Sequence, residues 1–312
     1  EIGNSGSDTW VEVTRNRPPD KPFFMWFAAL DAHRDWGENR FSGTHHPDSI
    51  TVPLYLADAE GTRRDFAQYY DEIYRFDYRI GEVLQVLEEQ NALQNTMIIV
   101  MADNGRPFPH SKTRVNDRGM KTPFIIHWPD KIGQKGAVCN SLVSVIDIAP
   151  TVLTLAGAGI DDSIQGYSFD ALLEDPSREF RNYVFAEHNW HDYEAHERMV
   201  RSRDFMYILN SRPLVPNMGP ADAIGSPSHN DLVSLKAKGA LTEVQTDVFV
   251  TPRPGEELYD CRTDSLQLLN VASLPGYREQ LQELRNVLKE WMDRTGDDIP
   301  ANLTRDWFLR EP

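Results

Sequence analysis

The fold is decided by one stretch of the sequence, TMIIVMADNGRPFPHSKTR at residues 96–114. Its first seven residues are largely apolar and predict a buried strand. The strand runs directly into Asp103 and Asn104, whose carboxylate and amide oxygens are the hard ligands that Ca²⁺ or Mg²⁺ takes. Gly105 lets the chain turn sharply, and Lys112 follows in a loop that can fold back over a metal. The same tripeptide also suits a plain turn, formed for backbone reasons alone.

Strands and helices are expected on both sides of this stretch. Residues 23–30 (FFMWFAAL) and 123–128 (PFIIHW) predict two further buried strands. Residues 62–93 carry apolar side chains at three- and four-residue steps, and residues 146–155 also suit a helix. This pattern predicts an α/β fold with a mainly parallel, helix-covered sheet, in which ligands gather at the C-terminal ends of the strands.

The character of the sequence changes after about residue 175. We therefore expect two units, with residues 1–175 forming the α/β part and residues 176–312 forming a smaller C-terminal α+β subdomain. The second unit combines short strands, a polar stretch of loop with some helix, and one amphipathic helix. These elements are expected at residues 183–186, 199–202, 205–209, 211–250 and 276–291.

A second polar cluster follows the first predicted strand, in LDAHRDW at residues 30–36. His33 and Arg34 can bind an anion, and His33 can pass a proton to a leaving group. Asp31 can orient an imidazole or a substrate hydroxyl or amine. A lone histidine at a strand end is more often a structural or surface residue, so the cluster gains weight only from its neighbours.

A third cluster is EHNWHDYEAHER at residues 187–198, which holds His188, His191 and His196. Their spacing fits no standard zinc site. We expect either a solvated loop or a loop that lines a sugar pocket through Trp190.

The composition excludes several classes of partner. The formal charge is −16, and phosphate backbones reward Lys and Arg, so a broad surface for nucleic acid or acidic lipid is excluded. A small anionic substrate remains compatible, because a few local cations can hold it.

No apolar run approaches the roughly 18–20 residues that a membrane span needs. The two cysteines, Cys139 and Cys261, have neither a metal-type spacing nor a disulfide framework.

Taken in order, these segments resemble the sulfatases of the alkaline-phosphatase superfamily. Residues 22–36 are similar to the family's strand with a histidine-bearing loop, and IIVMADNG is similar to its metal-binding strand end. The stretches at 112–129, 143–157, 198–210 and 257–273 resemble the elements that follow. Within the family, DNGRPFPHSKTR and LDAHR look closest to the heparan N-sulfatases. The resemblance covers roughly residues 21–296.

The resemblance implies roles for the polar residues. Asp103 and Asn104 would bind Ca²⁺, with Mg²⁺ as the alternative, and His33 and Lys112 would be catalytic residues that contact the sulfate. The substrate-binding residues would be Asp31, Arg34, His188 and His191. A metal ion, a lysine and a histidine around a sulfuryl group would stabilise the charge that develops as its bond breaks. The implied reaction is hydrolysis of a sulfuric ester or sulfamate on a sulfated sugar or glycosaminoglycan-type substrate, in a periplasmic, extracellular or lysosomal setting.

The sequence departs from the family at the nucleophile. Sulfatases make a formylglycine from the Cys or Ser of a Cys/Ser-x-Pro/Ala-x-Arg motif, and no stretch of this chain fits that motif. The paired aspartates of the family's first strand are also missing. We therefore expect the sequence to be the C-terminal portion of a longer enzyme, inactive alone and completed by a missing N-terminal segment of the same protein.

Two other functions stay open at this point. One is a phosphomonoesterase, phosphodiesterase or phosphonate hydrolase of the same superfamily, which would use two transition metals in place of Ca²⁺. The other is a non-catalytic protein that binds sulfated glycans. Metal content separates the first from a sulfatase, and tight glycan binding by a stable chain would favour the second.

Overall fold

A computed structural model describes residues 6–217 and 219–304. Its longest element is α2 (Glu60–Glu89), which carries apolar side chains at three- and four-residue steps and confirms the helix predicted at 62–93. Alongside it lies the short helix α1 (Trp10–Arg15). Within the described residues, no helix combines the length and the apolar character that a membrane span requires.

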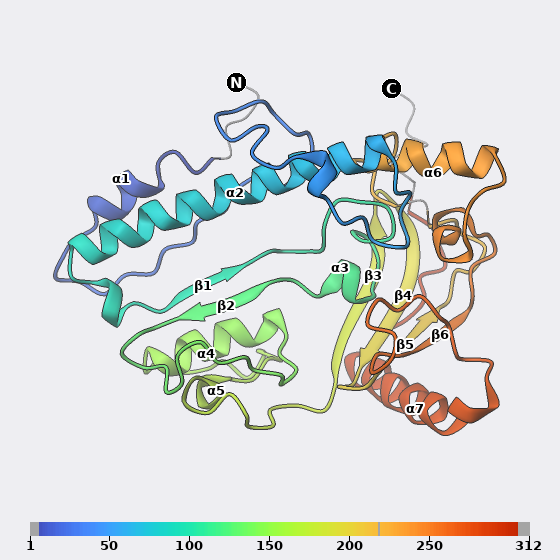
Figure 1. The fold of residues 1–312 in the computed structure, drawn as a ribbon. Coiled ribbons are helices and arrows are strands. Elements are labelled where there is room, and N and C mark those ends of the chain that lie inside the picture. The colour runs from blue at the N-terminus through green and yellow to red at the C-terminus, as the bar shows by residue number, and fades with distance from the viewer. Residues whose placement is uncertain (1–5, 218, 305–312) are drawn as a thin grey trace.

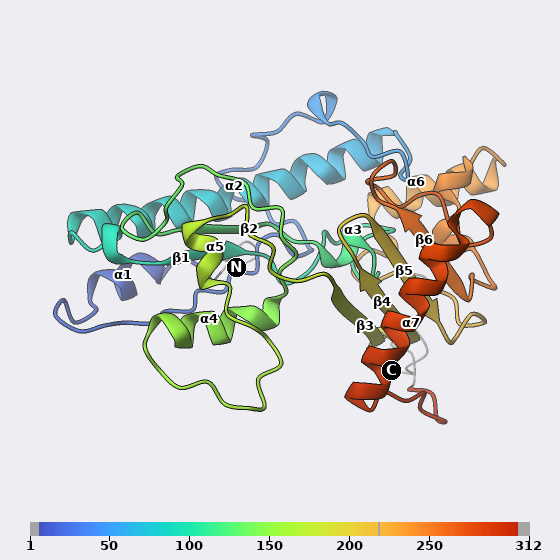
Figure 2. The same ribbon diagram turned by 90° about the horizontal axis from the view of Figure 1, so that it is seen from below.

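The strands predicted around the deciding stretch are present as β1 (Ile98–Met101) and β2 (Phe124–His127). Figures 1 and 2 place this ribbon between α2 on one side and α4 (Ile148–Leu155) and α5 (Asp170–Glu174) on the other. Phe169, Leu172 and Leu173 form the core on the α4–α5 side, packed against apolar residues of β2 and α4. The predicted helix-covered arrangement is therefore present.

The direction of the strands differs from the prediction. β1 and β2 pair antiparallel, with Ile98 opposite His127 and Met101 opposite Phe124, and no parallel pair occurs within the described ranges. A parallel pair needs a crossover, usually a long helix on one face. Residues 102–123 contain only the one-turn helix α3 (Asp117–Met120), so the chain returns beside its own strand.

Residues 23–30, which were predicted to form a strand, do not form one. This segment is extended, but it pairs with no strand in the described part of the chain. Its side chains alternate: Phe27 is partly covered and stacks on Trp10 at 5.2 Å between ring centroids, whereas Phe24 and Trp26 are 73% and 81% exposed. A continuous apolar run predicted burial on both faces, and only one face is covered.

The second half of the chain forms an antiparallel sheet in the order β3-β4-β5-β6. Its strands are β3 (Val184–His191), β4 (Tyr193–Arg201), β5 (Phe205–Asn210) and β6 (Glu256–Asp260). Helix α7 (Arg278–Thr295) packs Leu281, Leu284 and Leu288 against it, as the amphipathic pattern predicted. Residues 187–198, expected as a loop, are instead the β3–β4 hairpin, because their charged side chains find partners such as Asp297, whose oxygens lie 2.7 Å from Arg198.

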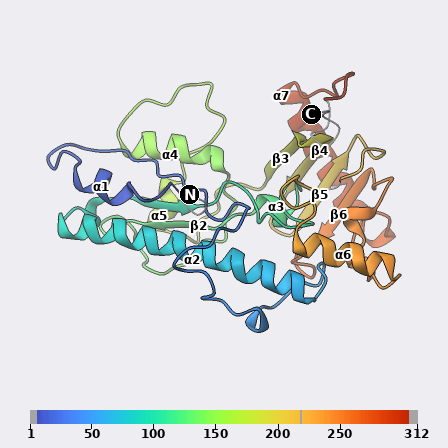
Figure 3. The same cartoon turned by 90° about the horizontal axis from the view of Figure 1, so that it is seen from above.

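Helix α6 (Pro227–Ala237) joins the two halves, lying at one end of α2 (Figure 3). Asp231 on α6 accepts hydrogen bonds from the backbone N–H and the hydroxyl of Thr62 on α2, at 2.7 and 3.0 Å. Leu232 is fully buried in a core shared with Phe66 and Phe108. The described structure also has short 3₁₀ turns, at Pro47–Ser49, Leu93–Asn95, Val145–Asp147, Glu243–Gln245, Asp247–Phe249 and Pro275–Tyr277.

Candidate functional site

The loop that follows β1 is held by two closely packed glycines. The Gly105 N–H donates to the Gly119 carbonyl at 2.7 Å, and a Cβ at Gly105 would lie 1.9 Å from the Arg118 carbonyl oxygen. Any larger residue would push the two segments apart. The loop therefore returns on itself beside the end of β1 and delivers Lys112 near Asn104, where both side chains line one cavity.

Lys112 and His33, for which the family resemblance implied catalytic roles, lie close together. The Lys112 Nζ lies 3.3 Å from the His33 Nε2. Both atoms also approach one oxygen of Asp222, at 2.8 Å from Lys112 and 3.3 Å from His33. The Lys112 side chain is 9% exposed, whereas that of His33 is 55% exposed. The ammonium is therefore fixed by a carboxylate while the imidazole remains open to a ligand.

Asp31 and Arg34, predicted to bind substrate, point into the protein on either side of His33. Arg34 donates to both oxygens of Asp65 at 2.7 Å and to the Pro107 carbonyl at 2.9 Å. Asp31 forms an ion pair with Arg75 on α2. Since both side chains are already engaged, they fix the loop that carries His33.

A cavity of about 340 Å³ opens beside Lys112, between the loop after β1 and the end of β3. His188, His191 and Trp190 line it, whereas His196 is buried elsewhere and its Nε2 lies 2.9 Å from the Asp298 carbonyl. The other lining residues are Asn104, Thr113, Arg114, Val115, Gly119, Met120, Glu187 and Asn189.

The wall of the cavity includes a charge network, buried except at Asp247, that the sequence did not reveal. The Arg114 guanidinium lies 2.7 Å from Asp247, which also approaches Arg253 at 3.1 Å and the His110 imidazole at 3.3 Å. Burial opposes ionisation of Asp247, but Arg114, His110 and Arg253 outweigh it and hold the pKa of this carboxyl well below its usual range. Arg114 is therefore held in place on the cavity wall, with its charge paired to Asp247.

The residues predicted as metal ligands supply two oxygen-bearing side chains. Asp103 is exposed and accepts the Asn104 N–H at 2.9 Å, and the Asn104 amide donates to the Gly105 carbonyl at 2.7 Å. Nowhere in residues 6–217 and 219–304 do three His, Cys, Asp or Glu side chains converge as a metal site. Because Ca²⁺ takes about six to eight oxygen ligands, Asp103 and Asn104 fit only part of a coordination shell.

The stability of the folded protein is expected to depend on pH through Glu72, which lies beside Asp31 and Arg75. Burial and the neighbouring Asp31 carboxylate raise its pKa from 4.5 to about 7. Glu72 therefore stays protonated in the folded protein at pH values where the same residue in the unfolded chain has lost its proton. Its contribution to the stability of the folded state then declines as the pH rises from about 4.5 to 7. We expect the free energy of unfolding to fall over this range by about 2–3 kcal/mol.

Urea unfolding at closely spaced pH values measures this decline. Glu72→Gln should remove most of it, whereas Glu88→Gln on the exposed face of α2 should leave it in place. A Glu72→Gln protein with the same pH slope as the wild type would contradict the assignment.

The sequence matches two known families. The family described as "Sulfatase" matches residues 7–158, and the family described as "N-sulphoglucosamine sulphohydrolase, C-terminal" matches residues 110–207. Together these ranges contain every site residue that the sequence predicted. Asp222 and Asp247 lie outside both.

Individual proteins that are similar to this chain also have sulfatase or sulphohydrolase names. An ulvan-active sulfatase of Formosa agariphila is 33% identical over 95% of this chain and 55% of its own length. The N-sulphoglucosamine sulphohydrolase of Homo sapiens is 26% identical over 89% of this chain and 62% of its own length. The chain thus spans about half the length of the curated relatives that it matches.

The fold has counterparts among solved structures. One, described as in complex with its substrate D-glucosamine-2-N,6-O-disulfate, superposes with a TM-score of 0.53 at 20% identity. The match covers 77% of this chain and 42% of that one. Likeness at this level concerns the fold alone, and it confirms the predicted α/β class.

Proposed function

Because this chain belongs to the sulfatase family, we propose that it forms the sulfate-binding side of an enzyme that hydrolyses a sulfuric ester or sulfamate on a sulfated sugar. The observation that carries the proposal is the contact between His33 and Lys112, with Lys112 lining a polar cavity beside Arg114. The names of the relatives support the substrate class, since they include an N-sulphoglucosamine sulphohydrolase and an ulvan-active sulfatase.

The side chains of this site suit the charge of a sulfuryl group. Lys112 would donate hydrogen bonds to its oxygens, and Arg114 would add a second positive charge at the cavity wall. The His33 Nδ1 contacts the Arg34 carbonyl, which can only accept, so Nδ1 carries a hydrogen. The Nε2 atom, which lies 3.3 Å from both Lys112 Nζ and an Asp222 oxygen, would then exchange a proton with the sugar oxygen or nitrogen that departs.

Asp103 and Asn104 would contribute two ligands to a Ca²⁺ ion, which supplies charge neutralisation at the sulfate oxygens when bound. No residue of this chain is assigned as the nucleophile, since no Cys or Ser lies in a formylglycine motif. Asp31 and Arg34 act in this proposal by holding the His33 loop.

The proposal extends to organisation and location. Residues 1–175 would belong to the catalytic α/β domain and residues 176–312 to the C-terminal subdomain, whose β3–β4 hairpin supplies one wall of the cavity. Sulfated glycans and Ca²⁺ are typical of periplasmic, extracellular or lysosomal settings, and we place the protein in one of them.

The choice of substrate and metal tests the proposed reaction. The protein, isolated from its natural source, is offered D-glucosamine 2-N-sulfate, D-glucosamine 6-O-sulfate and D-glucosamine 6-phosphate. We expect sulfate release from at least one sulfated sugar and no phosphate release. Chelation should abolish turnover, and Ca²⁺ should restore it where Zn²⁺ and Mn²⁺ do not. Phosphate release with Zn²⁺ or Mn²⁺ would favour a phosphatase or phosphonate hydrolase instead, and tight sugar binding without turnover would favour the glycan-binding protein.

A further inference from the structure

A carboxylate lies beside the two groups that are proposed to contact the sulfate. Asp222 places one oxygen 2.8 Å from the Lys112 Nζ and 3.3 Å from the His33 Nε2. Its side chain is 17% exposed, and its other oxygen is buried without a hydrogen-bond partner in the described part of the chain. Because like charges repel, this carboxylate weakens the attraction of the site for every anion. A feature that opposes binding in this way points to a role in selecting among anions.

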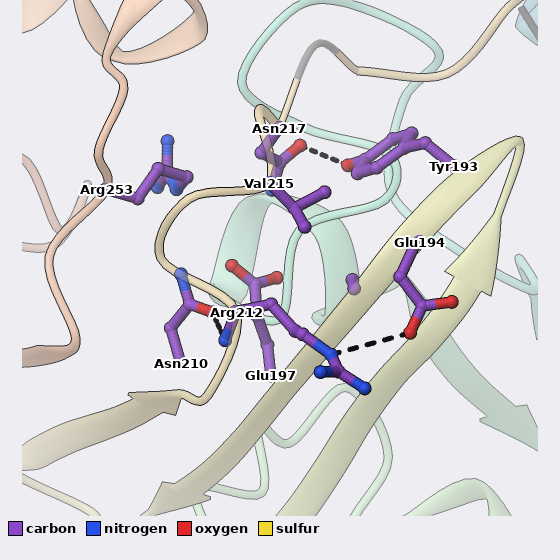
Figure 4. A pocket seen from close by; sticks show the side chains of 9 residues that line it. Tyr193, Glu194, Glu197, Asn210, Arg212, Val215, Asn217 and Arg253 are labelled. Carbon is purple, nitrogen blue, oxygen red and sulfur yellow. Dashed lines mark hydrogen bonds and ion pairs between the residues drawn. The ribbon is translucent and has the colours of Figure 1, made fainter. Parts of the chain in front are cut away.

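The chain segment that carries Asp222 is anchored, so the carboxylate cannot readily swing away. This segment joins β5 to α6, and its Ala221 N–H donates to Asp192, in the turn of the β3–β4 hairpin, at 2.8 Å. Figure 4 shows a second contact between the segment and the hairpin, in which the Tyr193 hydroxyl donates to the Asn217 side chain. The small cavity drawn there measures about 10 Å³, which is room for no more than about one water molecule. The segment therefore has little space in which to shift when a ligand arrives.

The lysine and the arginine that line the cavity are each balanced by a carboxylate. Lys112 pairs with Asp222 at 2.8 Å, and Arg114 pairs with Asp247 at 2.7 Å. A further acidic side chain, Glu187, lines the cavity itself. The cavity thus offers donors for the oxygens of an anion, but its own side chains supply little surplus positive charge. Such a cavity suits an anion of low charge better than one of high charge.

Tetrahedral anions of similar shape differ in charge. A sulfuric ester or a sulfamate carries one negative charge on its sulfuryl group, whereas a phosphate monoester carries roughly two above neutral pH, as does the sulfate ion that hydrolysis releases. An anion on the far side of the Lys112 ammonium would lie about 6 Å from Asp222, because two ion-pair distances of about 2.8 Å then lie end to end. At that separation one extra charge is disfavoured by a factor between about 3 and about 100, for effective dielectric constants between about 80 and about 20.

We propose that Asp222 is a specificity-determining residue that favours singly charged sulfuryl groups over dianions, both phosphate monoesters and the released sulfate. This inference rests on the proposed function and narrows the ligand class of the same site to monoanions. Asp222 does not itself line the cavity, so it acts through its charge and not through contact with the ligand.

Calorimetric titrations at about pH 8 test this role with three small anions. Methyl sulfate carries one charge, whereas methyl phosphate and inorganic sulfate carry roughly two. Asp222→Asn keeps the shape of the side chain and removes its charge. In this variant of the protein from its natural host, the affinity for both dianions should rise about tenfold relative to the affinity for methyl sulfate.

Two further variants separate charge from structure. Asp222→Glu keeps the charge and should keep the wild-type ratio of affinities. Asp77→Asn removes one charge from the exposed face of α2 and should also leave the ratio unchanged. Thermal melting shows whether each variant is folded, and Asp222→Ser supplies a second neutral side chain if Asp222→Asn is not.

The outcomes distinguish this inference from the proposed function. An unchanged ratio in a folded neutral variant, or the same change in Asp77→Asn, would overturn the inference and leave the proposed function standing. Equal weakening of all three anions in Asp222→Asn and Asp222→Glu would also overturn it, because Asp222 would then only hold the segment in place. A wild-type protein that binds none of the three anions would defeat the proposed function, and this inference with it.

Discussion

Replacing Lys112 by alanine should lower sulfate release by about 10²–10³-fold, the loss typical when one preorganised group that faces developing charge is removed. Its ammonium is nearly buried and fixed by Asp222 at 2.8 Å, so it needs little reorganisation when the sulfuryl oxygens gain charge. We expect the loss in both KM and kcat, because Lys112 contacts the sulfate of the bound sugar and the interaction strengthens as the bond to sulfur breaks. The measurement is steady-state sulfate release by the protein from its natural host.

A matched variant separates this loss from a general effect of charge. Lys121→Ala removes an exposed lysine that lies just after α3, and it should leave kcat and KM unchanged. Thermal melting of both variants shows whether each is folded. If folded Lys112→Ala kept more than about one tenth of the wild-type rate, Lys112 would not be a catalytic residue on the scale expected for such a group.

Replacing Asp65 by alanine should lower the free energy of unfolding by about 3–5 kcal/mol, because it strands a buried guanidinium. Asp65 accepts two hydrogen bonds from Arg34, one from the Trp36 indole and one from the Ser228 hydroxyl, each at 2.7 Å. The Arg34 side chain is 4% exposed, and its guanidinium carbon lies 4.7 Å from the ring centroids of both Trp36 and Phe108, so it cannot reach water without unpacking them.

Urea denaturation of Asp65→Ala and Asp77→Ala measures this cost. Asp77 is exposed on the same helix, and its replacement should change stability by no more than about 0.5 kcal/mol. A loss below about 1 kcal/mol in Asp65→Ala would show that the Arg34 pair does not anchor the loop. The result also bears on function, since Arg34 is the residue next to His33.

Strong periodicity explains why part of the fold was predictable. The repeat of apolar residues in α2 and α7 predicts helices, and the short apolar runs of β1 and β2 predict strands. Residues 23–30 were misread because an apolar run shows that a segment avoids water, and it does not show which neighbours cover it. Strands were predicted at 183–186 and 199–202, but the part of the β3–β4 hairpin between them was missed for the opposite reason, since its charged residues are buried through ion pairs made with distant segments.

The candidate site, like the fold, was predictable from the sequence only in part. His33, Lys112, His188 and His191 stand in short motifs, and the structure brings them to or beside one cavity. No sequence motif pointed to Asp222, because this residue reaches Lys112 from a polar loop 110 residues away. Asp31 and Arg34 illustrate a further limit, since the partners that engage them lie on α2 and come close only after folding.

The central claim is that the cavity beside Lys112 binds a sulfated sugar. Calorimetric titration of the protein with D-glucosamine 2-N-sulfate and with D-glucosamine tests it most directly, since D-glucosamine lacks the sulfo group and carries a free amine in its place. The account predicts that the sulfated sugar binds, that D-glucosamine does not bind detectably, and that Lys112→Ala loses the sulfated ligand. Equal affinity for the two sugars, or undiminished binding by Lys112→Ala, would contradict it.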